Sequence, residues 1–574
     1  MDIANTSTAV CSVLAGVLSC YVGLKVYRRQ QVKKKALKKR EESRRALQDV
    51  LRSVATDDQP TAAKRREILS LTLPQLSQQL RDGQLSAVQV LQAFQEKATT
   101  ENQKLNCLTE PVPGALAAAQ GLDAEGEKTG LLHGVPVSIK DNVDIKGMAT
   151  TMGVTKHLDT PADEDAVIVQ VLKKQGAVPF VKTNIPQTLL SMACSNPVFG
   201  ETVNPVDPTR SPGGSSGGEG ALIRSGGSVL GIGSDIAGSA RIPAHFCGVF
   251  GFKPTAYRLS PKGFKSSSPG QQGVVSAPGL LARDVDSLAL GMKTLLVPDM
   301  FQLDPLVIPV PFRQEIYEDK KPMRIGYFTT LQSCPPTPSM GRAVIMAKEA
   351  LEKAGHTLVA FDPPDQMYAI IDLALRLLTS DGGQTFNTMW LKDEIVDECI
   401  KSQISLMTMP YYLRRIVSFL LKPIWPRISR SLSHRLLGSI YELWQRLVER
   451  EEYIQTFLAE WKEKELDVLL CPAFGMPACK PEHAGRLIIA ASYTILFNLL
   501  NLPAGVVPVT MVTEEDDMLL DDWQGYGNDL FDRLIRKTIK GAVGLPVSVQ
   551  CVALPWQEEK CLRLMKEVET LCPV

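Results

Sequence analysis

Residues 210–245, RSPGGSSGGEGALIRSGGSVLGIGSDIAGSARIPAH, are rich in glycine and serine and carry the side chains best suited to covalent chemistry. Glycine permits positive φ and close approach to the main chain, so successive N–H groups can converge on one anionic point. Ser215 and Ser216 lie in the first glycine cluster, and Ser239 follows Ile-Ala-Gly. Acyl transfer requires such a hydroxyl beside converging amides, because the nucleophile and the oxyanion donors must lie close together.

Three other interpretations of this segment are open. Gly/Ser-rich runs are often flexible linkers, but apolar pieces at 221–223 and 229–232 predict a short helix and a buried strand. Phosphate binding is disfavoured, because no lysine follows the glycines as in a Walker A loop and the glycine spacing misses the dinucleotide pattern. Ser215 fits the GxSxG elbow of α/β-hydrolases, which requires a downstream acid and histidine. The histidines after it are His245, His356, His434 and His483.

Lys140 supplies a base that these serines need. It ends the alternating run GVPVSIK, residues 134–140, which predicts a strand, and Asp141-Asn142 predicts the turn after it. In α/β sheets, ligands bind at the carboxyl ends of strands. Burial without a counter-charge lowers a lysine pKa and leaves a neutral amine, which could draw a proton from one serine through another.

Composition excludes several classes of function. The 574 residues suffice for one large α/β domain. With 63 basic and 62 acidic residues, the net charge of +1 gives no global attraction to nucleic acid or to acidic substrates. The twelve cysteines lack CxxC or Cys/His spacing, so we expect free thiols in a reducing compartment, no metal and no cofactor.

Strand and helix patterns alternate along the body of the chain. Capping-box sequences at Thr72 and Ser86 predict two amphipathic helices. The expected later strands are 134–140, 177–182, 324–328, 356–361, 466–470, 505–510 and 546–552, and the expected later helices are 165–175, 341–354 and 557–571. The fold class is therefore α/β, a single large domain with a central twisted mixed β-sheet surrounded by many helices.

The N-terminus predicts a membrane anchor. Residues 8–27 favour a short transmembrane helix, because 17 uncharged residues are followed by eleven Lys and Arg against two Glu. A cleaved signal peptide is the alternative, but the tail 1–7 lacks its basic start. The basic flank keeps its side in the cytosol. We expect residues 28–66 to form a solvated basic helical stalk beside anionic headgroups, and residues 67–574 to form the catalytic domain.

Residues 401–441 contain no acidic side chain. Arginines alternate with aromatic and aliphatic residues in helices interrupted by Pro410, Pro423 and Pro426, which predicts a helical hairpin that dips into the bilayer interface. The alternative is a buried hairpin whose arginines reach solvent. A second membrane contact would let a lipid enter the site without crossing water.

Three separated elements together resemble the amidase signature family. They are Lys140 at a strand end, PGGSSGGEGAL at 212–222 and GSDIAGSARIPA at 233–244. The membrane span, the hairpin, SNPVFGETVNP at 195–205 and GLPVSVQCVALPWQEE at 544–559 are similar to the membrane-bound members that hydrolyse fatty-acid amides. The resemblance begins near residue 70 and implies the amidase signature fold.

Carried over by position, this resemblance implies a Ser-Ser-Lys triad. Ser239 would be the nucleophile that forms the acyl-enzyme, Ser215 the bridge and Lys140 the base. A proton held on Lys140 could return through Ser215 to the leaving nitrogen. The resemblance places backbone N–H groups of 236–239 in an oxyanion hole. The implied substrate-binding residues are Leu189, Ser215, Ile236, Ala237, Gly238 and Ser239.

The resemblance also implies supporting residues and two departures. An acyl-chain channel would include Leu190, Met192 and Phe531, although core packing would look the same. Ser216 would support Lys140 or the loop, and Asp235 would pair with Arg241. The chain has Ser234 where the family has Thr, and Ala237 where the family has Gly. The alanine would destabilise the loop by about 1 kcal/mol if residue 237 has a positive φ, and would cost nothing otherwise.

We therefore expect a serine hydrolase that cleaves N-acylethanolamines such as anandamide, and primary amides such as oleamide, to fatty acid and amine, with activity on esters. The alternatives are an amidase of another substrate class, such as a transamidating subunit, an esterase using Ser215, or a membrane protein without turnover, for which Ala237 is the only hint. The expected partners are a lipid amide, the membrane and a second copy of the chain, with no nucleic acid. The expected location is the endoplasmic reticulum or Golgi membrane, with the catalytic domain cytosolic.

Overall fold

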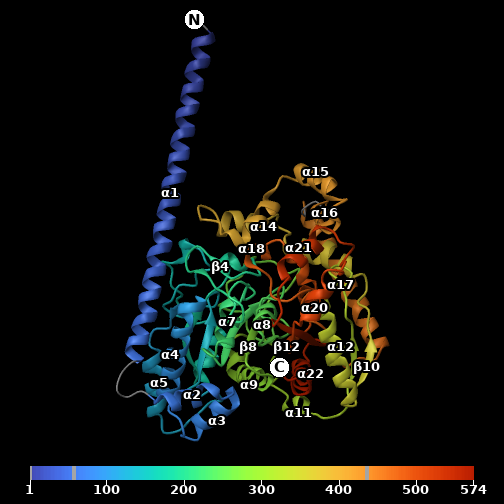
Figure 1. Cartoon of the computed structure of the whole chain (residues 1–574). Helices are drawn as coiled ribbons and strands as arrows, with labels where there is room; N and C mark the ends of the chain where they lie inside the picture. Colours follow the sequence, from blue (N-terminus) through green and yellow to red (C-terminus); the bar gives the residue numbers. More distant parts are fainter. Residues whose placement is uncertain (1–2, 55–59, 434–437) are drawn as a thin grey trace.

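The computed structural model describes residues 3–54, 60–433 and 438–574, without the side chains of residues 3–13 and Val54. Within these residues an eleven-stranded mixed sheet runs through the molecule in the order β1-β3-β2-β6-β8-β7-β12-β13-β11-β9-β10, surrounded by helices (Figure 1). β4 and β5 form a separate pair. The predicted α/β fold with a central mixed sheet is confirmed.

The strands are β1 Leu108–Pro111, β2 Pro136–Lys140, β3 Val178–Thr183, β4 Ser195–Asn196, β5 Gly200–Glu201, β6 Leu230–Asp235, β7 Phe250–Lys253, β8 Ala277–Ala282, β9 Arg324–Tyr327, β10 Thr357–Ala360, β11 Val468–Pro472, β12 Ala504–Met511 and β13 Pro546–Ala553. Each strand expected from the sequence is present to within a few residues. The strands at the centre of the sheet are buried almost throughout, because helices cover them.

The helices are α1 Ile3–Val54, α2 Ala62–Ser70, α3 Leu73–Arg81, α4 Ala87–Leu105, α5 Ala115–Ala124, α6 Val167–Lys174, α7 Gly217–Arg224, α8 Arg241–Cys247, α9 Val285–Leu295, α10 Pro298–Leu303, α11 Gln314–Tyr317, α12 Pro338–Lys353, α13 Leu375–Leu378, α14 Glu398–Thr408, α15 Tyr411–Leu421, α16 Pro426–Ser433, α17 Ile440–Glu463, α18 Pro481–Ala484, α19 Ser492–Leu499, α20 Glu514–Leu519, α21 Leu530–Ile539 and α22 Glu558–Leu571. Both predicted capping boxes are present, with Thr72 and Ser86 accepting from the N–H groups of Gln75 and Gln89.

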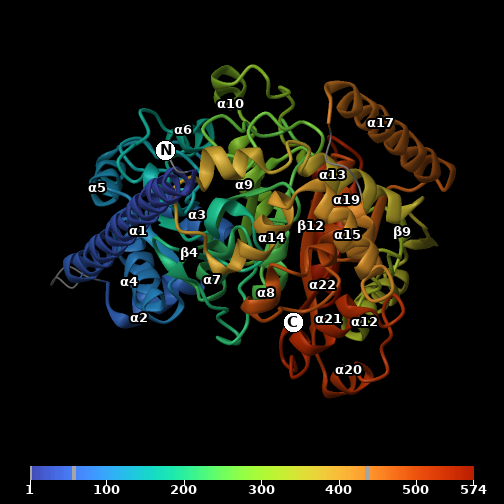
Figure 2. The ribbon, with the colours of Figure 1, turned by 90° about the horizontal axis from the view of Figure 1, so that it is seen from above.

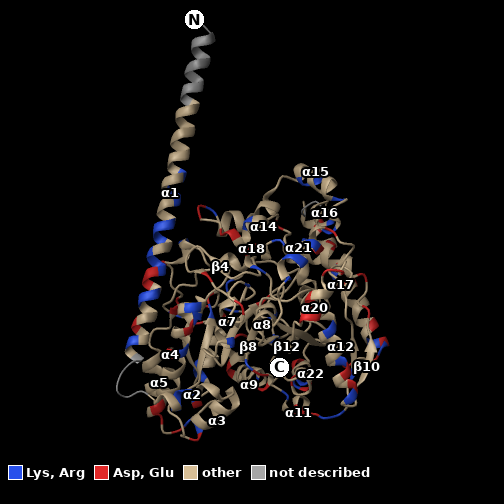
Figure 3. Ribbon diagram, viewed as in Figure 1, with Lys and Arg blue, Asp and Glu red and all other residues tan. Residues whose placement is uncertain are grey.

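Of the basic stalk expected over 28–66, residues 28–54 are helical as expected, but this half of α1 packs on the catalytic domain and does not stand free in solvent. Ala36 and Leu47 are buried, and α1 lies against α4 and β1. The Arg40 guanidinium donates to the carbonyls of Pro197 and Val198 at 2.9 Å each. Lys and Arg recur along this half of α1 (Figure 3). Some of them pair with the domain, as Lys35 does with Asp159 and Lys39 with Glu110, while many others are exposed.

The first half of α1 projects beyond the domain (Figures 1 and 2). None of the described helices has the length and apolar character that a bilayer crossing needs. Part of the predicted span, residues 8–13, lies outside the described side chains, and residues 1–2 of the expected tail lie outside the described chain.

The segment 401–441 forms a hairpin of α15 and α16 after α14, and Pro410 and Pro426 start its helices as expected. Large apolar side chains of α15 face solvent, with Tyr412 81%, Ile416 58% and Phe419 77% exposed. This differs from the alternative of a buried hairpin. Residues 434–437 lie outside the described chain.

Candidate active site

Two neighbouring parallel strands bring the predicted catalytic residues to one edge of the sheet. β2 ends at Lys140 and pairs in parallel with β6, with Ser138 opposite Gly231. Their carboxyl ends therefore lie side by side, at the position where α/β sheets bind ligands. The loop 236–240 follows β6 directly, so Ser239 reaches the edge that carries Lys140.

Lys140 is fully buried, and its Nζ lies 2.8 Å from Ser215 Oγ and 2.9 Å from Ser234 Oγ. Burial lowers the pKa of Lys140 to about 7, and the Asp235 carboxylate gives the largest opposing effect. The amine is therefore largely neutral slightly above neutral pH and can accept a proton. The direction agrees with the expectation, but a counter-charge, Asp235, is present.

Ser234 was not assigned a role from the sequence, and Ser216 was expected to support either Lys140 or the loop; the contact with Lys140 is made by Ser234. The Ser216 hydroxyl has no hydrogen-bond partner among the described residues. Its backbone N–H instead donates to the Ser239 carbonyl at 3.0 Å, which joins the two serine loops. The sequence signals for Ser234 were its position near the end of a strand and the hydroxyl-bearing Thr that the family has there.

Ser215 follows a glycine at which two backbone segments lie in close contact. It is 1% exposed and lies two residues before α7, next to the N-cap Ser216, and its peptide bond with Gly214 is cis. A Cβ on Gly214 would lie 2.1 Å from the Ser191 carbonyl oxygen, so only glycine fits there. The glycine cluster therefore sets the position of the Ser215 hydroxyl against Lys140.

Asp235 fixes the loop that carries Ser239 through hydrogen bonds to its backbone. Asp235 accepts from the N–H groups of Gly238 at 2.9 Å and Ala240 at 3.1 Å. It also forms a buried, two-pronged ion pair with Arg241, as expected. The Arg241 guanidinium holds the pKa of Asp235 well below its usual range, despite burial. The carboxylate therefore stays charged and continues to accept hydrogen bonds from the backbone of the loop.

Thr494, on α19, also holds this loop by a hydrogen bond, and sequence reasoning missed it. Its hydroxyl donates to the Ala237 carbonyl at 2.7 Å. Gly238 has a φ of +116°, and a Cβ there would lie 2.5 Å from Thr494 Oγ1. Ala237 is not among the residues with positive φ. The alanine at 237 is therefore free of backbone strain, and the strained position is the glycine that follows it.

The free backbone donors in this loop differ from the expected four. The Gly238 N–H is bonded to Asp235, whereas those of Ile236, Ala237 and Ser239 have no acceptor within the part of the chain that the structure describes. Three unpaired N–H groups beside a hydroxyl can stabilise an oxyanion.

A cavity of about 200 Å³ opens over these groups, and Leu189, Ser215, Ser234, Ile236 and Ser239 line it. Leu189 has a φ of +63°, a conformation that is strained for leucine and is common at functional sites. Pockets for whole ligands usually measure about 300–1,000 Å³, so this cavity has room for the reacting end of a substrate.

Of the described residues that line this cavity, none is Leu190, Met192 or Phe531. Met192 is buried in the main core. Leu189 and Leu190 pack against a separate apolar cluster, which sequence reasoning missed, of Met152, Val154, Phe386, Trp390, Leu391, Ile400 and Ile404. An apolar region therefore begins beside the cavity and continues into α14.

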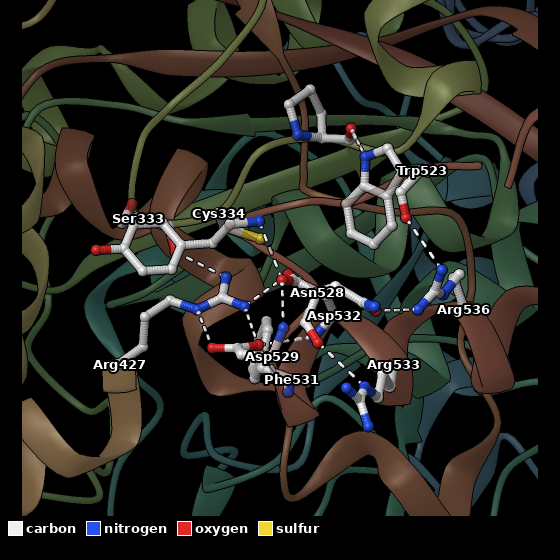
Figure 4. Close-up of polar contacts among 12 residues, drawn as sticks. Ser333, Cys334, Arg427, Trp523, Asn528, Asp529, Phe531, Asp532, Arg533 and Arg536 are labelled. Atoms are coloured by element: carbon white, nitrogen blue, oxygen red, sulfur yellow. Dashed lines mark hydrogen bonds and ion pairs between the residues drawn. The ribbon is translucent and has the colours of Figure 1, made fainter. Parts of the chain in front are cut away.

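Phe531 lies in a buried ion cluster at the base of the α15–α16 hairpin (Figure 4). Its ring centroid lies 4.6 Å from the guanidinium carbon of Arg427, which is itself fully buried. Arg427 binds Asp529 and Asp532, each at 2.5 Å, and donates to the Ser333 carbonyl at 3.2 Å. This cluster attaches α16 to α21 and to the loop before α12.

No described histidine is bonded to Ser215. His245 contacts the Met476 carbonyl, His356 accepts from the Met323 N–H, and His483 contacts Thr538. His434 lies outside the described residues. The α/β-hydrolase interpretation of Ser215 therefore receives no support, while Lys140 is in direct contact with it.

A buried lysine hydrogen-bonded to a serine, at the carboxyl end of a strand in a large mixed sheet, is the arrangement that the resemblance to the amidase signature family led us to expect. The family model described as Amidase matches residues 89–562. The chain belongs to this family. It is 47% identical to fatty-acid amide hydrolase 1 of Sus scrofa over 88% of this chain and 86% of that protein, and 38% identical to fatty acid amide hydrolase 1 of Caenorhabditis elegans over 89% and 90%.

One further relative and one solved structure are also similar to the chain. The chain is 46% identical to the vitamin D3 hydroxylase-associated protein of Gallus gallus, over 71% of this chain and 89% of that protein. A solved structure named fatty acid amide hydrolase superposes with a TM-score of 0.77 at 26% identity, covering 95% of this chain and 96% of that one.

Proposed function

We propose that this amidase hydrolyses fatty-acid amides, both N-acylethanolamines such as anandamide and primary amides such as oleamide, to free fatty acid and amine. The observation that carries the proposal is the 2.8 Å contact between the buried Lys140 Nζ and Ser215 Oγ, in the cavity that Ser239 also lines. The names of the relatives support the lipid substrate.

In the proposed reaction, Ser239 Oγ attacks the amide carbon and forms the new C–O bond. Its proton passes to Ser215, whose own proton passes to Lys140 Nζ, because neutral Nζ is a competent base. The oxyanion is held by the free N–H groups of Ile236, Ala237 and Ser239. Lys140 then returns its proton through Ser215 to the nitrogen, so the C–N bond breaks and the amine leaves. Water, activated by the same relay, releases the fatty acid from Ser239.

The acyl chain has an apolar path in this proposal. Leu189 lines the cavity and packs, with Leu190, on the cluster that contains Phe386 and Trp390. A fatty chain that entered this cluster would run from the reacting carbon towards α14 and the hairpin, so its burial would favour long acyl amides over short ones. Met192 and Phe531 would border this route from the surrounding core.

Two features support attachment to a membrane. The apolar side chains of α1 from Leu14 to Tyr27 are more than half exposed in most cases, and α1 projects on the side of the molecule that carries α15 (Figure 1). α15 exposes Ile416, Phe419 and Leu420 on that side. In the proposal, α1 anchors the chain in an endomembrane, the α15 face enters the same leaflet, and the catalytic domain stays cytosolic.

The test is mass spectrometry of the full-length protein after reaction with a fluorophosphonate, together with oleamide hydrolysis. We expect the adduct on Ser239, loss of labelling in Ser239→Ala, and loss of oleamide hydrolysis in Lys140→Ala. An adduct on Ser215 or Ser216 would refute the assignment of the nucleophile. Turnover of a glutaminyl amide but not of oleamide would refute the substrate class.

For the membrane contact, the triple variant I416S/F419S/L420S should keep oleamide turnover in detergent and lose activity on oleamide held in vesicles. Leu306→Ser is the control for loss of an exposed apolar side chain, because Leu306 is 73% exposed and lies between α10 and α11, outside the hairpin. Equal losses in both variants would argue against a membrane role for α15.

A further inference from the structure

Glu219 is a buried carboxyl group behind the catalytic lysine, and the reaction described above does not use it. It lies on α7, four residues after Ser215, and is fully buried. Its Oε2 accepts from Ser138 Oγ at 2.5 Å and its Oε1 accepts from Thr183 Oγ1 at 2.8 Å. Within the described residues these two hydroxyls are its hydrogen-bond donors, and no ion pair accompanies them.

Both donors lie next to Lys140 in the sheet. Ser138 is two residues before Lys140 on β2, so the two side chains point to the same face. Thr183, on β3, is the register partner of Lys140 in the parallel β2–β3 pair. Glu219 therefore connects the helix that follows Ser215 to the two strands that position Lys140.

The Glu219 carboxyl group fits against the sheet because residue 231 on β6 is a glycine. A Cβ on Gly231 would lie 2.2 Å from Glu219 Oε2, so the glycine of β6 opposite Ser138 is needed for the close approach. A glycine in a strand interior weakens the strand and often marks such an approach. The carboxyl group is thus held by three neighbouring strands and one helix.

Several charged and titratable groups face Lys140. Asp235 on β6 is already paired with Arg241, and Cys194 lies before β4. Asp141, directly after β2, is paired with Lys182 on β3, with 3.0 Å between the charged atoms. Glu219 is the carboxyl group in this set that has no cation of its own. Burial raises the pKa of Glu219 to about 7, while its two hydroxyl donors and the charge of Lys140 lower it.

We propose that Glu219 is a positioning residue of the amidase reaction. Its hydrogen bonds to β2 and β3 fix α7, and so Ser215, against Lys140. Its negative charge stabilises the ammonium that forms on Lys140 when Ser239 loses its proton. This inference rests on the proposed function, because it assumes that Lys140 is the base.

The charge and the hydrogen bonds are separable by substitution. Glu219→Gln keeps a side chain of the same shape and removes the charge, so the Lys140 ammonium loses a stabilising neighbour and its pKa falls. The acidic limb of the kcat/KM profile for oleamide should move about one unit towards lower pH, and kcat on the plateau should fall about tenfold with KM little changed.

Glu558→Gln is the matched control, because Glu558 is also a fully buried carboxylate but is paired with Arg258. It should lower the Tm without moving the limb. Glu219→Asp, which keeps the charge on a shorter side chain, should return the limb to its wild-type position even where kcat stays low.

The outcomes separate the two proposals. If Lys140→Ala retains full turnover, the lysine is not the base and the proposed function fails. If Lys140→Ala is inactive but Glu219→Gln has the wild-type limb or one moved to higher pH, the role of Glu219 alone is refuted. A limb that moves equally in Glu558→Gln would also overturn it, because a general loss of stability would then be the cause.

Discussion

Replacing Lys140 by methionine should abolish amide hydrolysis and make the protein more stable near neutral pH. The folded chain holds the Lys140 proton with a pKa of about 7, against an ordinary value of 10.5 for the unfolded chain. Each pH unit between these values is worth about 1.4 kcal/mol, so burial of this amine costs about 5 kcal/mol at pH 7. The methionine variant also loses the hydrogen bonds to Ser215 and Ser234, each of which stabilises the fold by about 1 kcal/mol. The free energy of unfolding should therefore rise by about 3 kcal/mol.

The sign of the pH dependence is equally specific. Between pH 7 and 10.5 the unfolded chain binds one more proton at Lys140 than the folded chain, so the stability of the wild type rises with pH. The advantage of Lys140→Met should therefore shrink by about 1.4 kcal/mol for each unit of pH above 7.

The assay is urea unfolding of the detergent-solubilised full chain at pH 7, 8 and 9, followed by tryptophan fluorescence. Lys392→Met, at an exposed position, is the control and should change neither stability nor activity. A Lys140→Met variant that is less stable than the wild type at pH 7, or whose advantage is constant with pH, would show that the lysine is not a desolvated amine. The reasoning on its role as base would then fall.

Three other substitutions test the surroundings of the site. Ser234→Ala should lower kcat about fivefold through loss of a contact to the Lys140 amine, and Ser234→Thr should restore it; unchanged kinetics in the alanine variant would remove Ser234 from the site. Gly238→Ala should lower kcat at least tenfold, because the positive φ and the contact with Thr494 force the loop to move; a normal rate would contradict the loop geometry. Arg427→Met should lower the free energy of unfolding by about 3–5 kcal/mol, because it leaves two buried carboxylates unpaired, and a Tm within a degree of wild type would disprove that.

The sheet could be predicted because its signals are local, whereas the pairing of Lys140 with Ser215 was implied by the resemblance to the amidase signature family. Alternating apolar residues predict buried strands, and the glycine cluster marks Ser215 in one short segment. Ser234 and Thr494 were missed because their roles depend on strand order and on a helix more than 250 residues away from the loop that it supports. Glu219 was part of the quoted motif, but its two donors lie on different strands.

Two other contacts could not be predicted for a related reason. The basic run in α1 predicted a solvated stalk, because the sequence cannot show that the carbonyls of Pro197 and Val198 accept from Arg40. Phe531 was assigned to the acyl channel by resemblance alone, and its stacking on Arg427, between α21 and α16, was not expected. In both cases the partners are more than 100 residues distant in the chain.

The middle of the sheet is made last. β12 and β13 lie between β7 and β11, so the strands from the first and second halves of the chain join only through residues after 503. Thr494, which secures the loop of Ser239, immediately precedes them on α19. A ribosome-bound chain shorter than about 550 residues would hold every catalytic side chain without the frame that aligns them. Hydrolysis should therefore start only after nearly the whole polypeptide has emerged, long after α1 has been synthesised.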